Sequence, residues 1–414
     1  MHTFLNTKLS SPKETLLKLG NPPDDYQHHQ FLKPLQLNPK SPLHYKLSLL
    51  TDKYVQDTKG DRGSKQLEVY RCHWQWVLLG LARSLLSNNW LLVSLDSKAY
   101  SSDIWLKRYE LKYASIKAIK DHLEEQGLIE VLRGKRYKDQ PSRTRIYPSK
   151  ALASVLWEYA VATEEAIEGP YLRLNEGDSK WREVLFDLDE DHPDLADMIA
   201  INEFLKGHQW AAKGPVSLIY KNSPFEGGRL YTAFQNLSDR RTRVRINTLI
   251  DSKPICEVDF SANHLRMNLA INAKLFAGET PYEDICEIAG VIPRDRVKEF
   301  ITVAMGANDE KSGFNALRQK GFNDEFSNRI YKATLQRYPK LKLFNGWGTN
   351  LQSIEGQILK DVMVQGLQEG IVCLPVHDAI VVQQEHKDWA VEAMKHTWAV
   401  HLDGCPTRVT VDEP

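Results

Sequence analysis

Lys253–Ile271 reads KPICEVDFSANHLRMNLAI and changes its hydrophobic period within a few residues. It opens with a short apolar run that predicts a buried strand, and from Ser261 onward the apolar residues recur at helical spacing. Asp259 therefore lies where a strand ends and the chain turns into a helix. A carboxylate at such a junction projects from a rigid element, next to backbone groups that are free to bind a ligand.

Charge is distributed unevenly along the 414 residues, although lysine plus arginine (54) equal aspartate plus glutamate (54). Residues 128–147 carry six basic and two acidic side chains, whereas residues 164–197 carry twelve acidic and three basic ones. Blocks of opposite sign predict separate segments with separate partners. The length allows two or three domains with cores of their own.

The five cysteines lie far apart and form no CxxC pair. This spacing argues against a zinc site or a disulfide framework and favours free thiols in a reducing compartment. No charged segment followed by an apolar core opens the sequence, and no apolar run approaches membrane-spanning length. We therefore expect a cytoplasmic protein without a membrane partner.

The first half of the chain divides into three expected regions. Residues 1–68 contain many prolines and little periodicity, which predicts an irregular arm. Residues 69–150 contain helical patterns, a helix stop at Gly127, a strand, a basic loop and a returning strand. Residues 151–225 are acidic and predict a helical connector, in the place that a thumb would occupy.

The order of helix, helix and basic hairpin in residues 69–150 resembles the winged helix-turn-helix family. That resemblance implies that the second helix enters the DNA major groove and that the hairpin contacts phosphate. The hairpin residues that would do so are Arg133, Lys135 and Arg136. The plainer interpretation is a small helical domain with a solvated charged hairpin.

Several short motifs follow one another in residues 226–414. The chain reads Gly228-Arg-Leu, Gln235-Asn-Leu, DFSANHLR from Asp259 to Arg266, Arg294-x-x-x-Lys298 and Val376-His-Asp378. In this order they resemble the palm and fingers of family A DNA polymerases and, more distantly, the single-subunit RNA polymerases of the same superfamily. The resemblance implies an α+β fold: an antiparallel palm sheet with helices and helical fingers, preceded by the winged-helix-like module.

Asp259 and Asp378 are the expected metal ligands. Nucleotidyl transfer uses two divalent ions that clamp the attacking 3′-oxygen and the triphosphate, and Mg²⁺ takes only one or two protein carboxylates. One aspartate that ends a strand and one in a hairpin can meet across adjacent strands. The carbonyl of Phe260 is a further candidate ligand, and Mn²⁺ could replace Mg²⁺. Either aspartate alone would be read as a turn or cap residue.

Cations are expected around the incoming triphosphate. Arg294 and Lys298 lie four residues apart on one helix face, and the resemblance implies that this face points at the phosphates; two solvated surface cations are the plainer alternative. Lys298 is therefore a candidate catalytic residue. The resemblance also implies nucleic-acid contacts for a set of further residues: Arg229, Gln235, Asn236, Gln357 and His377.

The sequence departs from the family at the positions that contact the sugar and the base of the nucleotide. His264 stands where the family has a glutamate that blocks the ribose 2′-hydroxyl, and Gly306 stands where an aromatic residue is usual. Use of ribonucleotides is therefore an open alternative to use of deoxyribonucleotides.

We expect a template-dependent nucleotidyltransferase, a DNA-polymerase-like enzyme that extends a nucleic-acid 3′-end on a primer–template or single-stranded template with dNTPs. Its small size beside a DNA-binding module points to replication of a phage, plasmid or mobile element, together with other replication proteins. Two alternatives remain: a primase or single-subunit RNA polymerase that uses NTPs, and a non-catalytic DNA-binding replication initiator.

Overall fold

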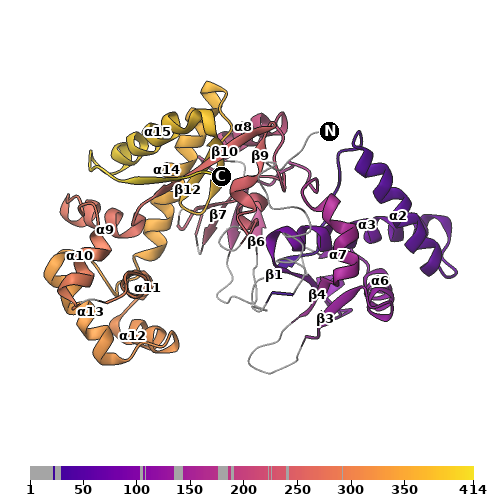
Figure 1. The fold of residues 1–414 in the computed structure, drawn as a ribbon, viewed down its shortest axis with the longest axis horizontal. Coiled ribbons are helices and arrows are strands. Elements are labelled where there is room, and N and C mark those ends of the chain that lie inside the picture. The colour runs from indigo at the N-terminus through magenta and orange to yellow at the C-terminus, as the bar shows by residue number, and fades with distance from the viewer. Residues whose placement is uncertain are drawn as a thin grey trace.

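Helices combine with three small sheets, which confirms the α+β class at this level (Figure 1). The computed structural model describes residues 22–23, 29–102, 106–107, 109–134, 143–175, 185–187, 191–221, 223–224, 226–238, 242–290 and 292–414. None of the helices in these ranges is long and apolar enough to cross a lipid bilayer.

The N-terminal region is built around the long helix α3 (Ser64–Ser87). Its apolar face is fully buried, with Trp74, Leu78 and Leu85 at 0% exposure, and it packs against α2 and α7. The other elements of this region are β1 (His29–Phe31), α2 (Pro42–Thr58), β2 (Trp90–Val93), α4 (Ala99–Ser102), α6 (Tyr113–Glu125), β3 (Ile129–Leu132), β4 (Thr144–Pro148) and α7 (Lys150–Ala160).

The helix and hairpin expected in residues 113–148 are present. Helix α6 is followed by Gly127 at φ 62°, and strands β3 and β4 then pair antiparallel, with Ile129 opposite Pro148. The sheet has the order β1–β2–β4–β3. The tip of the hairpin, including Lys135 and Arg136, lies outside the described residues.

The expectation of an irregular arm over residues 1–68 is wrong for its second half. Helix α2 begins at Pro42, and the side chain of Ser41 accepts a hydrogen bond from the amide of Leu43. A proline at the first helical position costs nothing, because that amide has no partner inside the helix. Pro42 therefore starts a helix where we expected it to break one.

The expected helical connector at residues 151–225 also contains strands. Strands β5 (Leu172–Asn175), β6 (Leu185–Asp187) and β7 (Ser217–Lys221) join β8 (Arg229–Tyr231) in a sheet of order β6–β5–β7–β8. Leu172 and Leu174 are buried and alternate with polar neighbours, the period of a strand with one buried face. Within the described part of residues 151–225, helix occurs in α7 and in α8 (Leu195–Lys206), and the sheet crosses the expected boundary at residue 225.

The strand-to-helix junction lies in the third sheet. Strand β10 (Lys253–Phe260) runs at its centre and is followed by helix α9 (Asn263–Ala273). The sheet has the order β11–β12–β10–β13, and β9 (Leu249–Ile250) pairs with the start of β10. Its other strands are β11 (Leu374–Val376), β12 (Ala379–Gln383) and β13 (Val409–Asp412).

Two long helices and a helical subdomain complete the chain. Helix α14 (Gly348–Glu369) packs against α15 (Lys387–His401), α8 and β8. The helical subdomain consists of α10 (Pro281–Ile288), α11 (Arg294–Gly306), α12 (Glu310–Gln319) and α13 (Asp324–Arg337). In Figure 1 it lies at the lower left, on the far side of the third sheet from the N-terminal region.

Candidate active site

The two aspartates come together across neighbouring strands. Strands β10 and β12 pair antiparallel with Asp259 opposite Ala379, and the amide of Phe260 donates to the carbonyl of Asp378 at 3.4 Å. Asp259 and Asp378, which we call the aspartate pair, are therefore neighbours at one edge of the sheet. The geometry that the motifs predicted for these two residues is present.

The aspartate pair carries more negative charge than its surroundings neutralise. Burial, followed by the charges of Asp378 and Glu257, raises the pKa of Asp259 to about 8. Burial and the charge of Glu355 likewise raise the pKa of Asp378. Among the described residues, the Oδ1 atom of Asp259 is buried and has no hydrogen-bond partner. Raised carboxylate pKa values and an unsatisfied oxygen are typical of a site that can bind a cation.

The turn that carries Asp378 is strained. Strands β11 and β12 are joined by two residues, and the first of them, His377, has a φ of 55°. A left-handed conformation costs a residue with a Cβ roughly 1–2 kcal/mol. His377 is exposed, so its side chain can reach a ligand at the edge where Asp378 lies.

A third buried carboxylate adjoins the aspartate pair. Glu355 lies on α14 and is 1% exposed. Its Oε2 accepts hydrogen bonds from Asn263 Nδ2 at 2.7 Å and His264 Nε2 at 3.0 Å, and its Oε1 is 3.6 Å from Arg229 Nε. Sequence reasoning missed Glu355, because its partners come from parts of the chain that are distant in sequence.

The two cationic side chains that we expected around the triphosphate have different surroundings. Lys298 is exposed on α11, and its charge lowers the pKa of Asp259, so its ammonium lies within electrostatic reach of that carboxylate. Arg294 Nε donates to Glu283 Oε1 at 2.7 Å, and its guanidinium is 5.3 Å from the centre of the Tyr282 ring. Arg294 is thus paired with neighbours on its own subdomain.

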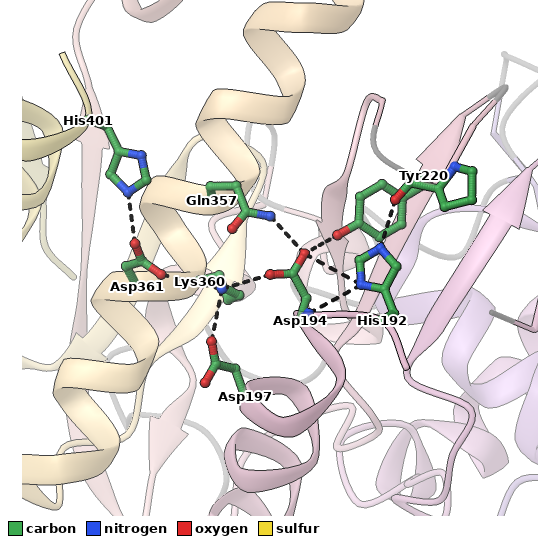
Figure 2. A network of polar contacts seen from close by, with 9 residues as sticks. His192, Asp194, Asp197, Tyr220, Gln357, Lys360, Asp361 and His401 are labelled. Atoms are coloured by element: carbon green, nitrogen blue, oxygen red, sulfur yellow. Dashed lines mark hydrogen bonds and ion pairs between the residues drawn. The ribbon is translucent and has the colours of Figure 1, made fainter. Parts of the chain in front are cut away.

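The predicted nucleic-acid contacts divide into accessible and inaccessible residues. Asn236 is exposed, and Arg229 is half-buried beside Glu355. Gln235 is buried at 8% exposure. Gln357 Nε2 donates to Asp194 Oδ2 at 2.9 Å (Figure 2). Minor-groove contact is therefore not supported for Gln235 or Gln357, because their amides face the protein interior.

The winged-helix-like face is nearly charge-balanced within the described residues. Arg133 Nη2 pairs with Glu124 at 3.0 Å, and Lys120 pairs with both Asp121 and Glu124. Lys117 also pairs with Asp121. The positive charge that the sequence predicted here is thus neutralised in part by the acidic residues of α6.

The oxygen ligands fit a hard cation. No group of three His, Cys, Asp or Glu side chains converges as a ready metal site in the parts of the chain that the structure describes. Mg²⁺, however, needs only one or two protein carboxylates and completes its shell with water and phosphate oxygens. The aspartate pair, with the unsatisfied Oδ1 of Asp259, meets that requirement.

Comparison of the chain with protein-family models and with curated proteins found no match.

Proposed function

We propose that the protein is a template-dependent nucleotidyltransferase that extends a nucleic-acid 3′-end by two-metal phosphoryl transfer. One observation supports this most strongly: Asp259 and Asp378 meet at one edge of the β10–β12 ladder with raised pKa values. Two carboxylates whose negative charge is not balanced by neighbouring cationic side chains are suited to bind divalent ions. The order of the surrounding motifs supports the same class of reaction.

The residues have separable roles in this proposal. Asp259 and Asp378 would hold Mg²⁺, with the carbonyl of Phe260 as a further ligand. When bound, the ions supply activation of the 3′-hydroxyl and neutralisation of the triphosphate. Lys298 places a positive charge next to Asp259, where it offsets negative charge that develops on the transferring phosphate.

Arg294 and Tyr282 are the residues that we expect beside the path by which the triphosphate enters this site. Burial raises the pKa of Tyr282 to about 12, so its hydroxyl stays protonated at neutral pH. The charge of Arg294 acts to lower this pKa, and the charge of Asp378 acts to raise it. Tyr282 thus lies within electrostatic reach of both Arg294 and Asp378. Release of Arg294 from Glu283 would allow it to bind a phosphate without moving the α11 backbone.

A labelled-primer extension assay tests the proposal. The full chain is incubated with primer–template or single-stranded template, with dNTPs or NTPs, and with Mg²⁺ or Mn²⁺. We expect metal-dependent extension that falls on the order of 10³-fold or more in Asp259→Asn and Asp378→Asn, because each change removes charge from the metal site. Asp412→Asn is the matched control, since Asp412 lies on β13 of the same sheet with an exposed side chain.

The outcomes separate the alternatives. Normal extension by Asp259→Asn would end the proposal. Product made from NTPs without a primer would identify a primase or RNA polymerase. Absence of any turnover, together with tight binding of duplex DNA, would identify a non-catalytic initiator that acts through the N-terminal region.

A further inference from the structure

We propose that Glu355 is a positioning residue of the candidate site, which holds His264 and Arg229 beside Asp378 so that both can contact the sugar and phosphate oxygens of the substrates. This inference rests on the proposed function. It is carried by three observations: the contacts of Glu355, the backbone packing that places it, and the elements from which its partners come.

The contacts of Glu355 come from separate parts of the chain. Asn263 and His264 open helix α9, directly after the strand that ends near Asp259, and Arg229 lies on β8. A carboxylate with a side chain only 2% exposed is costly unless it is paired and hydrogen-bonded. Replacing a whole buried ion-pair set by apolar residues of similar volume is often neutral or stabilising, so packing alone does not account for a glutamate with these partners here.

Two glycines place Glu355 and Arg229 side by side. A Cβ on Gly356 would lie 1.7 Å from the carbonyl oxygen of Gly228, and a Cβ on Gly228 would lie 2.7 Å from the Tyr220 ring. Helix α14 and strand β8 therefore meet backbone to backbone. Each glycine directly adjoins a charged residue, so this close approach is what brings Glu355 within 3.6 Å of Arg229.

Glu355 leaves the outer atoms of both partners available. His264 turns its Nε2 atom to the carboxylate, which leaves Nδ1 as the second ring nitrogen. Arg229 turns its Nε atom to the carboxylate, which leaves its two terminal nitrogens. The side chains of His264 and Arg229 are 26% and 28% exposed, so each has an accessible part.

Both partners come from elements that border the aspartate pair. His264 opens α9, directly after the strand that carries Asp259, and β8, which carries Arg229, contacts β11, the strand that leads into the turn of Asp378. Two polar groups that border a metal-binding carboxylate suit a ligand rich in oxygen atoms. The 3′-terminal sugar of a strand and the sugar and phosphates of a nucleotide are such ligands.

The experiment compares Glu355→Gln with Glu369→Gln, the same change at the exposed C-terminal end of α14. In the primer-extension assay we expect Glu355→Gln to lower kcat and to raise the KM for nucleotide, together by about 10- to 100-fold in kcat/KM, as for other residues that orient a ligand-binding group. The melting temperature should stay at or above that of the wild type, since a buried charge is removed. Wild-type kcat and KM in a folded Glu355→Gln would overturn the inference.

A second measurement needs no activity. In ¹⁵N-labelled histidine spectra of the wild-type chain, we expect His264 to show a slowly exchanging Nε2–H that disappears in Glu355→Gln and persists in Glu369→Gln. If the wild type lacks this signal, the inference fails even if the enzyme is active. If the signal is present but no nucleotide is incorporated, the proposed function fails, whereas the contact between Glu355 and His264 stands.

Discussion

Helix α14 separates two buried acidic clusters that differ in charge balance. On one side, Asp194 accepts hydrogen bonds from Lys360 at 2.8 Å, from Gln357 at 2.9 Å and from Tyr220 (Figure 2). On the opposite side of the helix lie Glu355 and the aspartate pair. We call the first group, Asp194, Tyr220, Gln357 and Lys360, the Asp194 cluster.

The two clusters respond to burial in opposite ways. Burial alone would raise the pKa of Asp194, but hydrogen bonds from Lys360, Tyr220 and Gln357 hold it below its ordinary value. The pKa of Asp259 is raised to about 8, because neighbouring carboxylates add to burial there. Buried acids whose charge is paired can serve the fold alone, whereas acids with raised pKa values are candidates for a binding site. Charge balance, rather than burial, therefore separates the Asp194 cluster from the acids that we propose to bind metal.

The largest expected effect comes from moving the helix that both clusters share. In Gly356→Ala the new Cβ would overlap the carbonyl oxygen of Gly228, which is backbone and cannot rotate away. We expect a loss of more than about 4 kcal/mol in unfolding free energy, or no folded protein. Gly63→Ala is the control, because a Cβ at Gly63 meets no atom within 4 Å. Urea unfolding within ~1 kcal/mol of the wild type would show that α14 can shift without cost.

The next largest effect on stability is expected in the Asp194 cluster, whose charges are paired. Lys360→Met removes the ammonium and leaves the Asp194 carboxylate buried without its charge partner, which should cost about 3–5 kcal/mol of unfolding free energy. Adding Asp194→Asn should recover part of that loss, since the double variant has no unpaired charge. If Lys360→Met is as stable as the wild type in urea, the cluster does not stabilise the fold in the way that its contacts indicate.

The pH dependence should have opposite signs in the two clusters. A carboxylate with a raised folded pKa binds more protons in the folded than in the unfolded state, so metal-free protein should lose stability as pH rises from about 4 to about 8. The slope should be on the order of 1 kcal/mol per pH unit at most. Asp194, whose pKa is lowered, contributes stability above its ordinary pKa, which is lost only as pH falls below about 4.

Urea unfolding with a chelator between pH 5 and pH 9 measures this slope. The difference between the wild type and Asp259→Asn isolates the contribution of Asp259, because the two chains are otherwise identical. A variant that keeps the full slope would show that Asp259 is an ordinary ionised carboxylate in the metal-free protein.

Local pattern predicted the strand end and the turn that carry the two aspartates better than it predicted the sheets around them. The change of period at Asp259 and the V-H-D run at Asp378 each specify a strand end or turn, and both are where the sequence placed them. The strands at residues 172–221 were missed, because they lie in an acidic stretch whose charge obscured the alternation of buried leucines. Short-range pattern carries no information on such long-range pairing.

Glu355 was missed for a different physical reason. Its role depends on partners from α9 and β8, which are distant in sequence, so no local spacing reveals it. Gln357 shows the converse: it lies on the expected helix, but the amide points into the Asp194 cluster. Which face of α14 meets the site is decided by Gly356, through packing that only the folded chain shows.

The smallest expected effect separates strain from function in the turn beside Asp378. His377→Gly relieves a left-handed backbone and should raise the unfolding free energy by about 1 kcal/mol, whereas primer extension should fall because the imidazole is lost. Ser252→Gly is the matched control: Ser252 also has a positive φ, 67°, in the turn between β9 and β10. It should gain similar stability and keep full activity. Equal activity in both variants would mean that the strain at His377 has no functional purpose, and the contrast between the two clusters would then rest on the carboxylates alone.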